Sequence, residues 1–157
     1  MYSNLTESFN NWIMQAHHLT VLQMVDHIGA QIMDIKSRRR IKSATWQTFL
    51  CPRVHKRLEE MNEERRGMRV RPSDGIRFDV LGRELSYVVN LEDRTCLCEK
   101  WQVLKLPCVH ACAVLVSINE SLHTWCDPFY TTEMYRRTYG VNIFPIPTIR
   151  NAKTSVE

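Results

Sequence analysis

The stretch TCLCEKWQVLKLPCVHACAVL, residues 95–115, contains four side chains of the kinds that bind metal ions, arranged in two close pairs. Cys96 and Cys98 form the first pair, and nine residues later Cys108 and His110 form the second. Neighbouring thiols and an imidazole at such spacing are typical of a metal site built from two separate chain segments. The fold of this region therefore depends on whether the two pairs meet.

The local structure expected around each pair predicts that the two pairs meet. Alternate residues of a strand share one face, so a strand running into RTCLC would turn Cys96 and Cys98 the same way. Side chains at positions i and i+2 point in different directions inside a helix, so Cys108 and His110 would not meet there. Proline, however, is tolerated at the start of a helix. Pro107 therefore predicts that Cys108 and His110 lie on the turn that enters a helix.

Three sulfur ligands and one imidazole complete the tetrahedral coordination of a structural Zn²⁺ ion. Such a site leaves no position for water, which argues against hydrolytic zinc chemistry. The chain has no run of 18 apolar residues and no signal-peptide pattern at its N-terminus, so we expect no membrane association and a reducing compartment. There, metal binding is favoured over disulfides, the alternative use of six cysteines.

Other assignments of these side chains remain open from the sequence alone. Cys112 follows His110 by two residues and is an alternative ligand, whereas Cys51 and Cys126 have no partner spacing and are predicted to be buried thiols. The remaining histidines are scattered and are predicted to have surface or core roles; they are His17, His18, His27, His55 and His123.

The pattern of apolar residues predicts an α+β protein with an N-terminal helical arm and a small zinc-stabilised ββα module. Helical spacing covers residues 5–16 and 21–35, with Thr20 as an N-cap, and a third helix follows Pro52. Apolar residues then alternate over residues 76–91, which predicts a β-hairpin with a third strand into RTCLC. Helical spacing returns from residue 107.

We expect three parts along the chain. Residues 1–68 form a helical region with a basic connector, residues 69–125 form the zinc-binding module, and residues 126–157 form an aromatic, proline-bounded tail that packs on the β-module.

The segment CLCEKWQVLKLPCVHACAV resembles the SWIM zinc finger, whose pattern is Cys-x-Cys, a variable spacer and Cys-x-His. The spacer and the LPCVH turn are most similar to the plant mobile-element subtype, found in Mutator-like transposases and the far-red-response transcription factors derived from them. The resemblance covers about residues 76–120. It implies that Cys96, Cys98, Cys108 and His110 bind Zn²⁺.

The segment SNLTESFNNWI also resembles the end of the Mutator-like catalytic domain, where an N-x-x-E-S-x-N helix carries the last acid of an Asp-Asp-Glu triad. Glu7 would be that acid, but Asp26 and Asp34 follow it on a predicted helix and cannot replace the other two. One carboxylate cannot hold two divalent ions. Asn4 and Glu7 also have the spacing of a capping box. We therefore expect a C-terminal piece of a transposase that is not an enzyme and contains the helix-capping relic of a catalytic residue.

Charge is unevenly distributed along the chain, and together with the resemblance to Mutator-like transposases it predicts that the chain binds DNA or a DNA-bound partner in the nucleus. Residues 36–83 hold fourteen Lys/Arg and six Asp/Glu, and KSRRRIK alone has five cations in seven positions. The candidate DNA contacts are Arg38, Arg39, Arg40 and Lys42, with Lys100, Trp101 and Lys105 between the zinc ligands. Trp101 is alternatively a hydrophobic plug of the finger, and the basic run is alternatively a solvated helix face. A protein-interaction finger, with a dimer or partner surface on the helical arm, is the alternative function.

Overall fold

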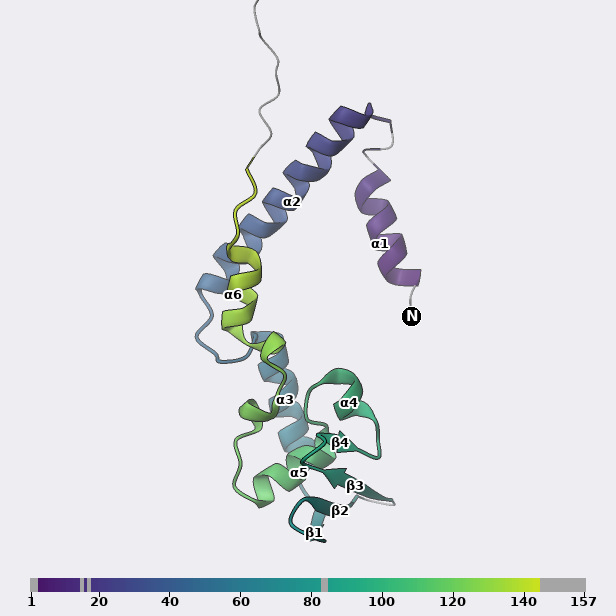
Figure 1. Cartoon of the computed structure of the whole chain (residues 1–157), viewed down its shortest axis with the longest axis vertical. Helices are drawn as coiled ribbons and strands as arrows, with labels where there is room; N and C mark the ends of the chain where they lie inside the picture. The colour runs from purple at the N-terminus through teal and green to yellow at the C-terminus, as the bar shows by residue number, and fades with distance from the viewer. Residues whose placement is uncertain (1–2, 15, 17, 83–84, 145–157) are drawn as a thin grey trace, which may run out of the picture. The chain divides into compact units, whose positions relative to one another are not determined.

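The structure, a computed structural model, describes residues 3–14, 16, 18–82 and 85–144. The chain forms two compact units (Figure 1). Unit 1 combines Met1–Ala44 with Thr138–Glu157, and unit 2 is Thr45–Arg137. None of the described helices is both long and apolar enough to cross a membrane.

Unit 1 consists mainly of helices α1, Ser3–Met14, and α2, Val21–Ala44. Thr20 caps α2 as predicted: its hydroxyl accepts the N–H of Gln23, and the Gln23 side chain accepts the Thr20 N–H in return. These reciprocal bonds are a capping box, which satisfies two otherwise unpaired donors of the first turn. By contrast, α1 already includes Asn4, so Asn4 is not the N-cap predicted from the sequence.

Unit 2 begins with α3, Pro52–Glu64, which follows the predicted pattern. Proline at the first position suits a helix start because its missing N–H is not needed there. Leu58 and Met61 are buried, as the apolar spacing predicted. The helix ends at Glu64, and Arg69–Pro72 form a strand that the sequence did not indicate.

Four strands form one antiparallel sheet in the order β1-β2-β3-β4. They are β1, Arg69–Pro72; β2, Arg77–Leu81; β3, Ser86–Asn90; and β4, Thr95–Cys96. The predicted hairpin pairs β2 with β3, and the predicted third strand is β4, so the α+β class is confirmed.

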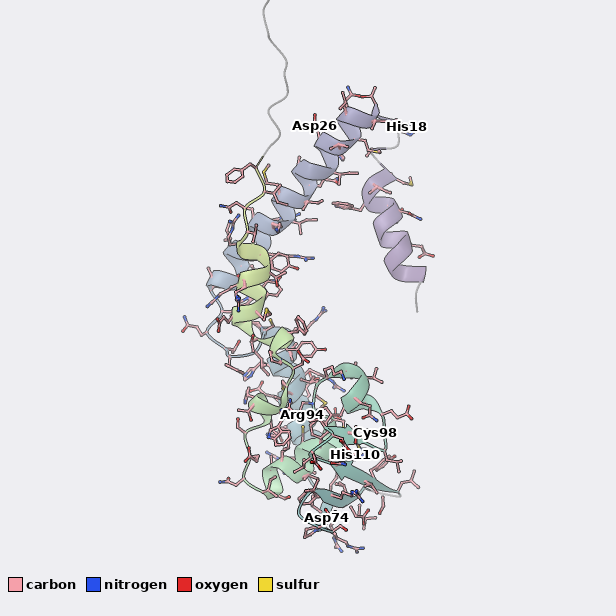
Figure 2. The ribbon with its side chains drawn as sticks, viewed as in Figure 1. His18, Asp26, Asp74, Arg94, Cys98 and His110 are labelled. Carbon is pink, nitrogen blue, oxygen red and sulfur yellow. The ribbon has the colours of Figure 1, made fainter. Side chains whose placement is uncertain are left out.

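The turn that joins β1 to β2 depends on Asp74, at one end of the sheet (Figure 2). Its carboxylate accepts the N–H groups of Ile76 and Arg77, and these hydrogen bonds lower the pKa of Asp74. Gly75 in the same turn has φ +83°, a conformation that glycine adopts without a steric penalty.

Short helices complete unit 2 after the sheet. The nine-residue spacer between the cysteine pairs forms helix α4, Lys100–Leu104, where the sequence predicted only a loop. Helix α5, Val109–Ser117, is the predicted helix after Pro107. The 3₁₀ helices η1, Leu122–Trp125, and η2, Pro128–Tyr130, then precede α6, Thr132–Gly140, whose residues up to Arg137 belong to unit 2.

Two hydrophobic clusters share α5. Cluster 1 lies between α5 and the sheet; its buried residues are Phe78, Val80, Val89, Leu91, Cys96, Trp101, Cys108, Ala111, Ala113, Val114 and Leu115. Cluster 2 includes residues of α3 and the C-terminal segment; its buried residues are Leu50, Leu58, Met61, Leu106, Cys112 and Cys126. Six consecutive residues of α5, 110–115, are buried because the helix is covered from both sides.

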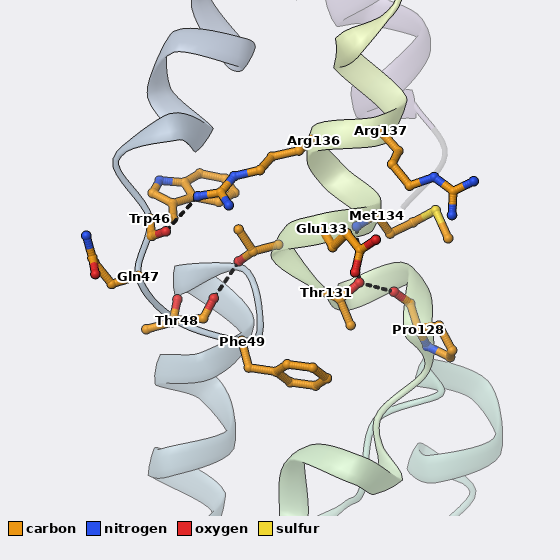
Figure 3. Close-up of a pocket in the computed structure, with 11 residues that line it drawn as sticks. Trp46, Gln47, Thr48, Phe49, Pro128, Thr131, Glu133, Met134, Arg136 and Arg137 are labelled. Atoms are coloured by element: carbon orange, nitrogen blue, oxygen red, sulfur yellow. Dashed lines mark hydrogen bonds between the residues drawn. The ribbon is translucent and has the colours of Figure 1, made fainter.

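Of the predicted tail, Cys126 and Tyr130 pack in cluster 2, and residues 145–157 lie outside the described residues. The Tyr130 hydroxyl donates to the Leu104 carbonyl at 2.7 Å, and Leu50 forms an isolated antiparallel bridge with Thr131. A pocket lies beside this bridge (Figure 3), where Arg136 donates to the Trp46 carbonyl at 2.7 Å. The predicted three-part division of the chain stays a prediction.

Candidate metal centre

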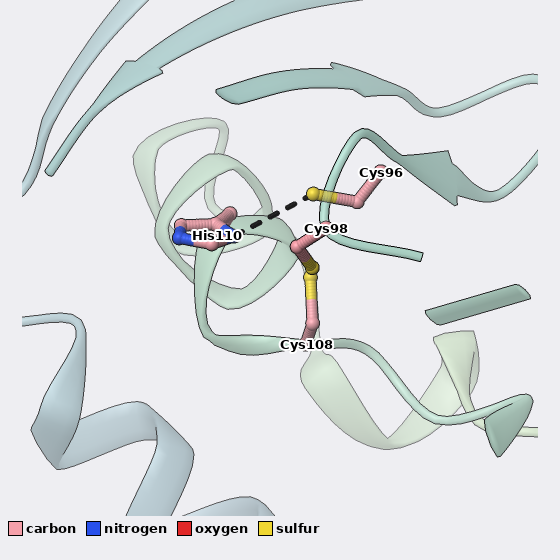
Figure 4. A group of neighbouring side chains, drawn as sticks. All are labelled: Cys96, Cys98, Cys108 and His110. Atoms are coloured by element: carbon pink, nitrogen blue, oxygen red, sulfur yellow. Dashed lines mark hydrogen bonds between the residues drawn. The ribbon is translucent and has the colours of Figure 1, made fainter. Parts of the chain in front are cut away.

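The structure brings together the side chains of Cys96, Cys98, Cys108 and His110 (Figure 4). Their sulfur and ring-nitrogen atoms all lie within 4.8 Å of one another. The Sγ atom of Cys96 lies 3.5 Å from Nδ1 of His110, so Nδ1 is the ring nitrogen that faces the sulfurs. Two pairs that the spacer separates in sequence thus form one donor set.

The sequence predicted that Cys96 and Cys98 share one face of a strand. The structure shows that they do not. Strand β4 ends at Cys96, and Cys98 lies on the turn that follows. The Glu99 N–H donates to the Cys96 carbonyl at 2.8 Å and closes this turn, with Glu99 at φ +61°. The reversal of the chain, rather than the strand pleat, brings Cys98 to the same side as Cys96.

The second pair lies where the sequence predicted it, at the start of α5. Cys108 is the N-cap of α5, and its sulfur accepts the N–H of Ala111 at 3.5 Å. His110 is the second residue of the helix, so both side chains leave the first turn together. The unpaired N–H groups of a helix start also favour thiolate over thiol at this position.

Two neighbouring side chains position the cluster and were not singled out from the sequence. The Gln102 amide accepts the Cys96 N–H at 3.1 Å and donates to the Cys96 carbonyl at 3.0 Å, which ties α4 to the end of β4. The ring of Tyr87 stacks on the His110 imidazole, with centroids 3.9 Å apart and planes 16° apart. Tyr87 is one of the residues that alternate along residues 76–91, and no sequence pattern marked Gln102.

The donor set fits zinc in chemistry and in spacing. Zinc lies about 2.3 Å from sulfur and about 2.0–2.1 Å from nitrogen, so tetrahedral donor atoms are separated by roughly 3.5–3.8 Å. The observed 3.5 Å between Cys96 and His110 falls in this range. Cys96, Cys108 and His110 are 1%, 2% and 8% exposed, which suits a closed structural site.

Comparison with known protein families found a match for the segment that contains these four side chains. Residues 87–119 match the SWIM zinc finger. The four side chains of the SWIM finger are positioned to bind Zn²⁺, which would cross-link the end of the sheet to the start of α5. No curated protein and no solved structure matches the chain.

The remaining cysteines lie outside the metal centre of the SWIM finger. Cys112, the alternative ligand, points into cluster 2, and burial raises the pKa of its thiol to about 12. Its thiol lies 3.8 Å from the Pro107 carbonyl. Burial likewise raises the pKa of Cys126 to about 12, and it raises that of Cys51. These three are placed as buried or half-buried thiols.

The residues suggested as DNA contacts fall into two groups in different units. Arg38, Arg39, Arg40 and Lys42 lie on the last two turns of α2 in unit 1. Lys100 and Lys105 are exposed at the two ends of α4 in the SWIM finger. Trp101 is only 1% exposed and packs in cluster 1, edge-on to Trp125 at 6.1 Å, which matches the alternative of a hydrophobic plug.

Hydrogen bonds among the cysteines of the cluster shift their pKa values in opposite directions. The hydrogen bond with Cys96 lowers the pKa of Cys108 to about 4, and the same contact together with burial raises the pKa of Cys96. Burial raises the pKa of Cys98. These shifts favour the thiol at Cys96 and Cys98 and the thiolate at Cys108.

Zinc binding to the SWIM finger is expected to release at least two protons per ion between pH 6 and pH 8. Zinc needs thiolates, so the protons on Cys96 and Cys98 compete with it, and the apparent affinity falls about 100-fold per pH unit of acidification. Calorimetric titration in buffers of different ionisation enthalpy measures the number of protons. Cys112→Ala should release the same number, and a count below two would contradict the expectation.

Proposed function

We propose that this chain is a non-enzymatic zinc-binding protein of Mutator-like transposase origin that binds DNA in the nucleus. The observation that carries the DNA part is the run of five cations in seven residues, Lys36 to Lys42, on α2. Arg38, Arg39 and Lys42 are exposed, and the other two are half-buried. Lysine and arginine on such a surface neutralise backbone phosphates without regard to sequence. The SWIM finger would then serve as the rigid element of unit 2.

The cations of α2 are available to phosphates although they have partners inside the protein. Arg38 pairs with Asp34 at 2.8 Å, with both side chains more than 60% exposed. Arg39 lies 5.0 Å from the ring centre of Tyr139 and donates to its hydroxyl. Exposed contacts of this kind contribute only about 0–1 kcal/mol, so a phosphate can replace them. Arg38, Arg39 and Lys42 also line one shallow groove.

The SWIM finger offers a weaker basic surface. Lys105 and Arg94 line one pocket, but Asp93 and Asp127 line it too, so its charges balance. The guanidinium of Arg94 lies 5.2 Å from the ring centre of Trp125, which holds it against the finger. We therefore assign the larger share of phosphate affinity to α2.

Salt dependence tests this function. With three phosphate contacts, raising salt from 50 to 300 mM weakens binding to a duplex by about 100-fold. Replacing Arg38, Arg39 and Arg40 together with glutamine should remove most of that dependence, as measured by fluorescence anisotropy. A second variant, with Lys100→Gln and Lys105→Gln, should have the smaller effect.

The matched control removes the same charge from another helix. Arg53→Gln, Lys56→Gln and Arg57→Gln on exposed positions of α3 should leave the salt dependence unchanged. Equal losses in both triple variants would show that net charge alone governs binding. An affinity that is the same at 50 and 300 mM salt would rule out the DNA function.

A protein-interaction role is the second candidate, and exposed apolar residues on α2 favour it. Val21, Leu22 and Val25 are 71%, 80% and 48% exposed near its N-terminus. Apolar side chains exposed within one turn of a helix suit a helix-in-groove contact or a dimer. Binding of a protein partner or a dimer that is insensitive to salt and lost in Leu22→Glu would select this role over DNA binding.

A further inference from the structure

Two histidines that are far apart in the sequence face each other in unit 2. His55 lies on α3 and His123 on η1, and Nδ1 of His55 is 3.2 Å from Nε2 of His123. Both rings lie outside residues 87–119, which match the SWIM finger. Their contact thus has no part in the metal centre described above.

A carboxylate fixes which nitrogen of His55 is available. Oε1 of Glu59, one helical turn further along α3, lies 3.3 Å from Nε2 of His55. When Glu59 accepts the N–H from Nε2, the neutral imidazole has its lone pair on Nδ1, the nitrogen that faces His123. A carboxylate on the outer nitrogen of an imidazole is the arrangement that orients histidine ligands of metals.

The two rings are attached to elements that a common core holds in place. Val54 and Leu58 of α3 pack in cluster 2, as does Leu122, the neighbour of His123. The side chain of His55 is nevertheless 28% exposed, so solvent ions reach it. A site formed here is preorganised by the packing of cluster 2 and is open on its outer side.

We propose that His55 and His123 bind a second divalent transition-metal ion of the zinc class, with water completing its coordination. Two imidazole nitrogens at about 2.0–2.1 Å from zinc lie about 3.3–3.4 Å apart at a tetrahedral angle, close to the observed 3.2 Å. Imidazole suits zinc, cobalt, nickel and copper. The ion would cross-link η1 to α3 and leave open positions, unlike the closed site of the SWIM finger.

The same geometry permits a direct hydrogen bond between the rings, and the two arrangements differ in one proton. In the hydrogen bond, Nε2 of His123 carries the hydrogen and donates it to Nδ1 of His55. In the metal site both facing nitrogens present lone pairs, so the hydrogen of His123 moves to its Nδ1. The carboxylate of Glu59 keeps its N–H bond with His55 in both cases.

Titration of the zinc-loaded full chain with further Zn²⁺ tests the proposal. Calorimetry should show a second equivalent that binds more weakly than the first and shifts the imidazole NMR signals of His55 and His123. Both His55→Gln and His123→Gln should abolish the second equivalent and keep the first. Glu59→Gln should weaken it about 10–100-fold, as loss of a supporting carboxylate does.

Cobalt separates the two sites by their spectra. Co²⁺ in the finger has thiolate ligands and gives sulfur-to-metal charge-transfer bands, whereas a second Co²⁺ bound by imidazoles adds ligand-field bands alone. His18→Gln, at an exposed position of unit 1, is the matched control and should keep both equivalents. A wild-type chain that stays at one equivalent, or a second equivalent that persists in both His55→Gln and His123→Gln, would overturn the proposal.

Discussion

Replacing Cys108 with serine is expected to abolish zinc binding and to unfold the SWIM finger. Structural zinc contributes about 10–16 kcal/mol to the folding of small domains, as much as the whole stability of a typical domain. Cys108 is both a predicted ligand and the N-cap of α5, so serine removes the metal bond while keeping a capping oxygen. Any loss of structure in this variant therefore reports on the metal and not on the cap.

Metal analysis after dialysis and circular dichroism measure the two effects together. The wild-type chain should retain one tightly bound zinc, and Cys108→Ser should retain none and lose its sheet signal. Cys112→Ala, four residues along the same helix, should keep both. A well-folded spectrum of the wild-type chain without zinc would contradict the structural role of the ion.

Trp101→Ala is expected to destabilise the zinc-loaded finger by about 3–5 kcal/mol. The indole is 1% exposed, and truncating a buried aromatic side chain leaves a cavity that the surroundings fill only in part. It also removes the edge-on contact with Trp125. Urea unfolding followed by circular dichroism measures the change in the free energy of unfolding.

A substitution on the exposed side of the same helix provides the control. Val103 is 72% exposed, so Val103→Ala should change the unfolding free energy by less than about 0.5 kcal/mol. If Trp101→Ala left the stability unchanged and weakened DNA binding, Trp101 would be a base contact and not a core residue.

The sequence identifies the metal centre because its information is local. The donors are evident from the Cys-x-Cys and Cys-x-His pairs. The helix start that positions the second pair is indicated by Pro107. The predicted reason for the convergence of Cys96 and Cys98 was wrong, since the strand ends at Cys96 and a turn with Glu99 in a left-handed conformation follows it. Nothing in the residues at these positions marked that turn.

Features that depend on tertiary contacts were missed. Strand β1 is four residues of RVRP, too short and too polar to show alternation, and it forms because β2 lies beside it. Helix α4 has only five residues and is held by the burial of Trp101 and the bonds of Gln102. His55 and His123 are 68 residues apart in the sequence, so no local spacing pattern predicts that their rings meet.

The placement of α5 between two clusters means that unit 2 has no independent halves. A helix with six consecutive buried residues cannot melt on one side alone, because each cluster uses it as a wall. Loss of the ion at its first turn would thus be transmitted to α3 and to the C-terminal segment as a single cooperative event. Oxidation or chelation of a few buried atoms in the finger would in this way alter surfaces that contribute no ligand to its metal centre.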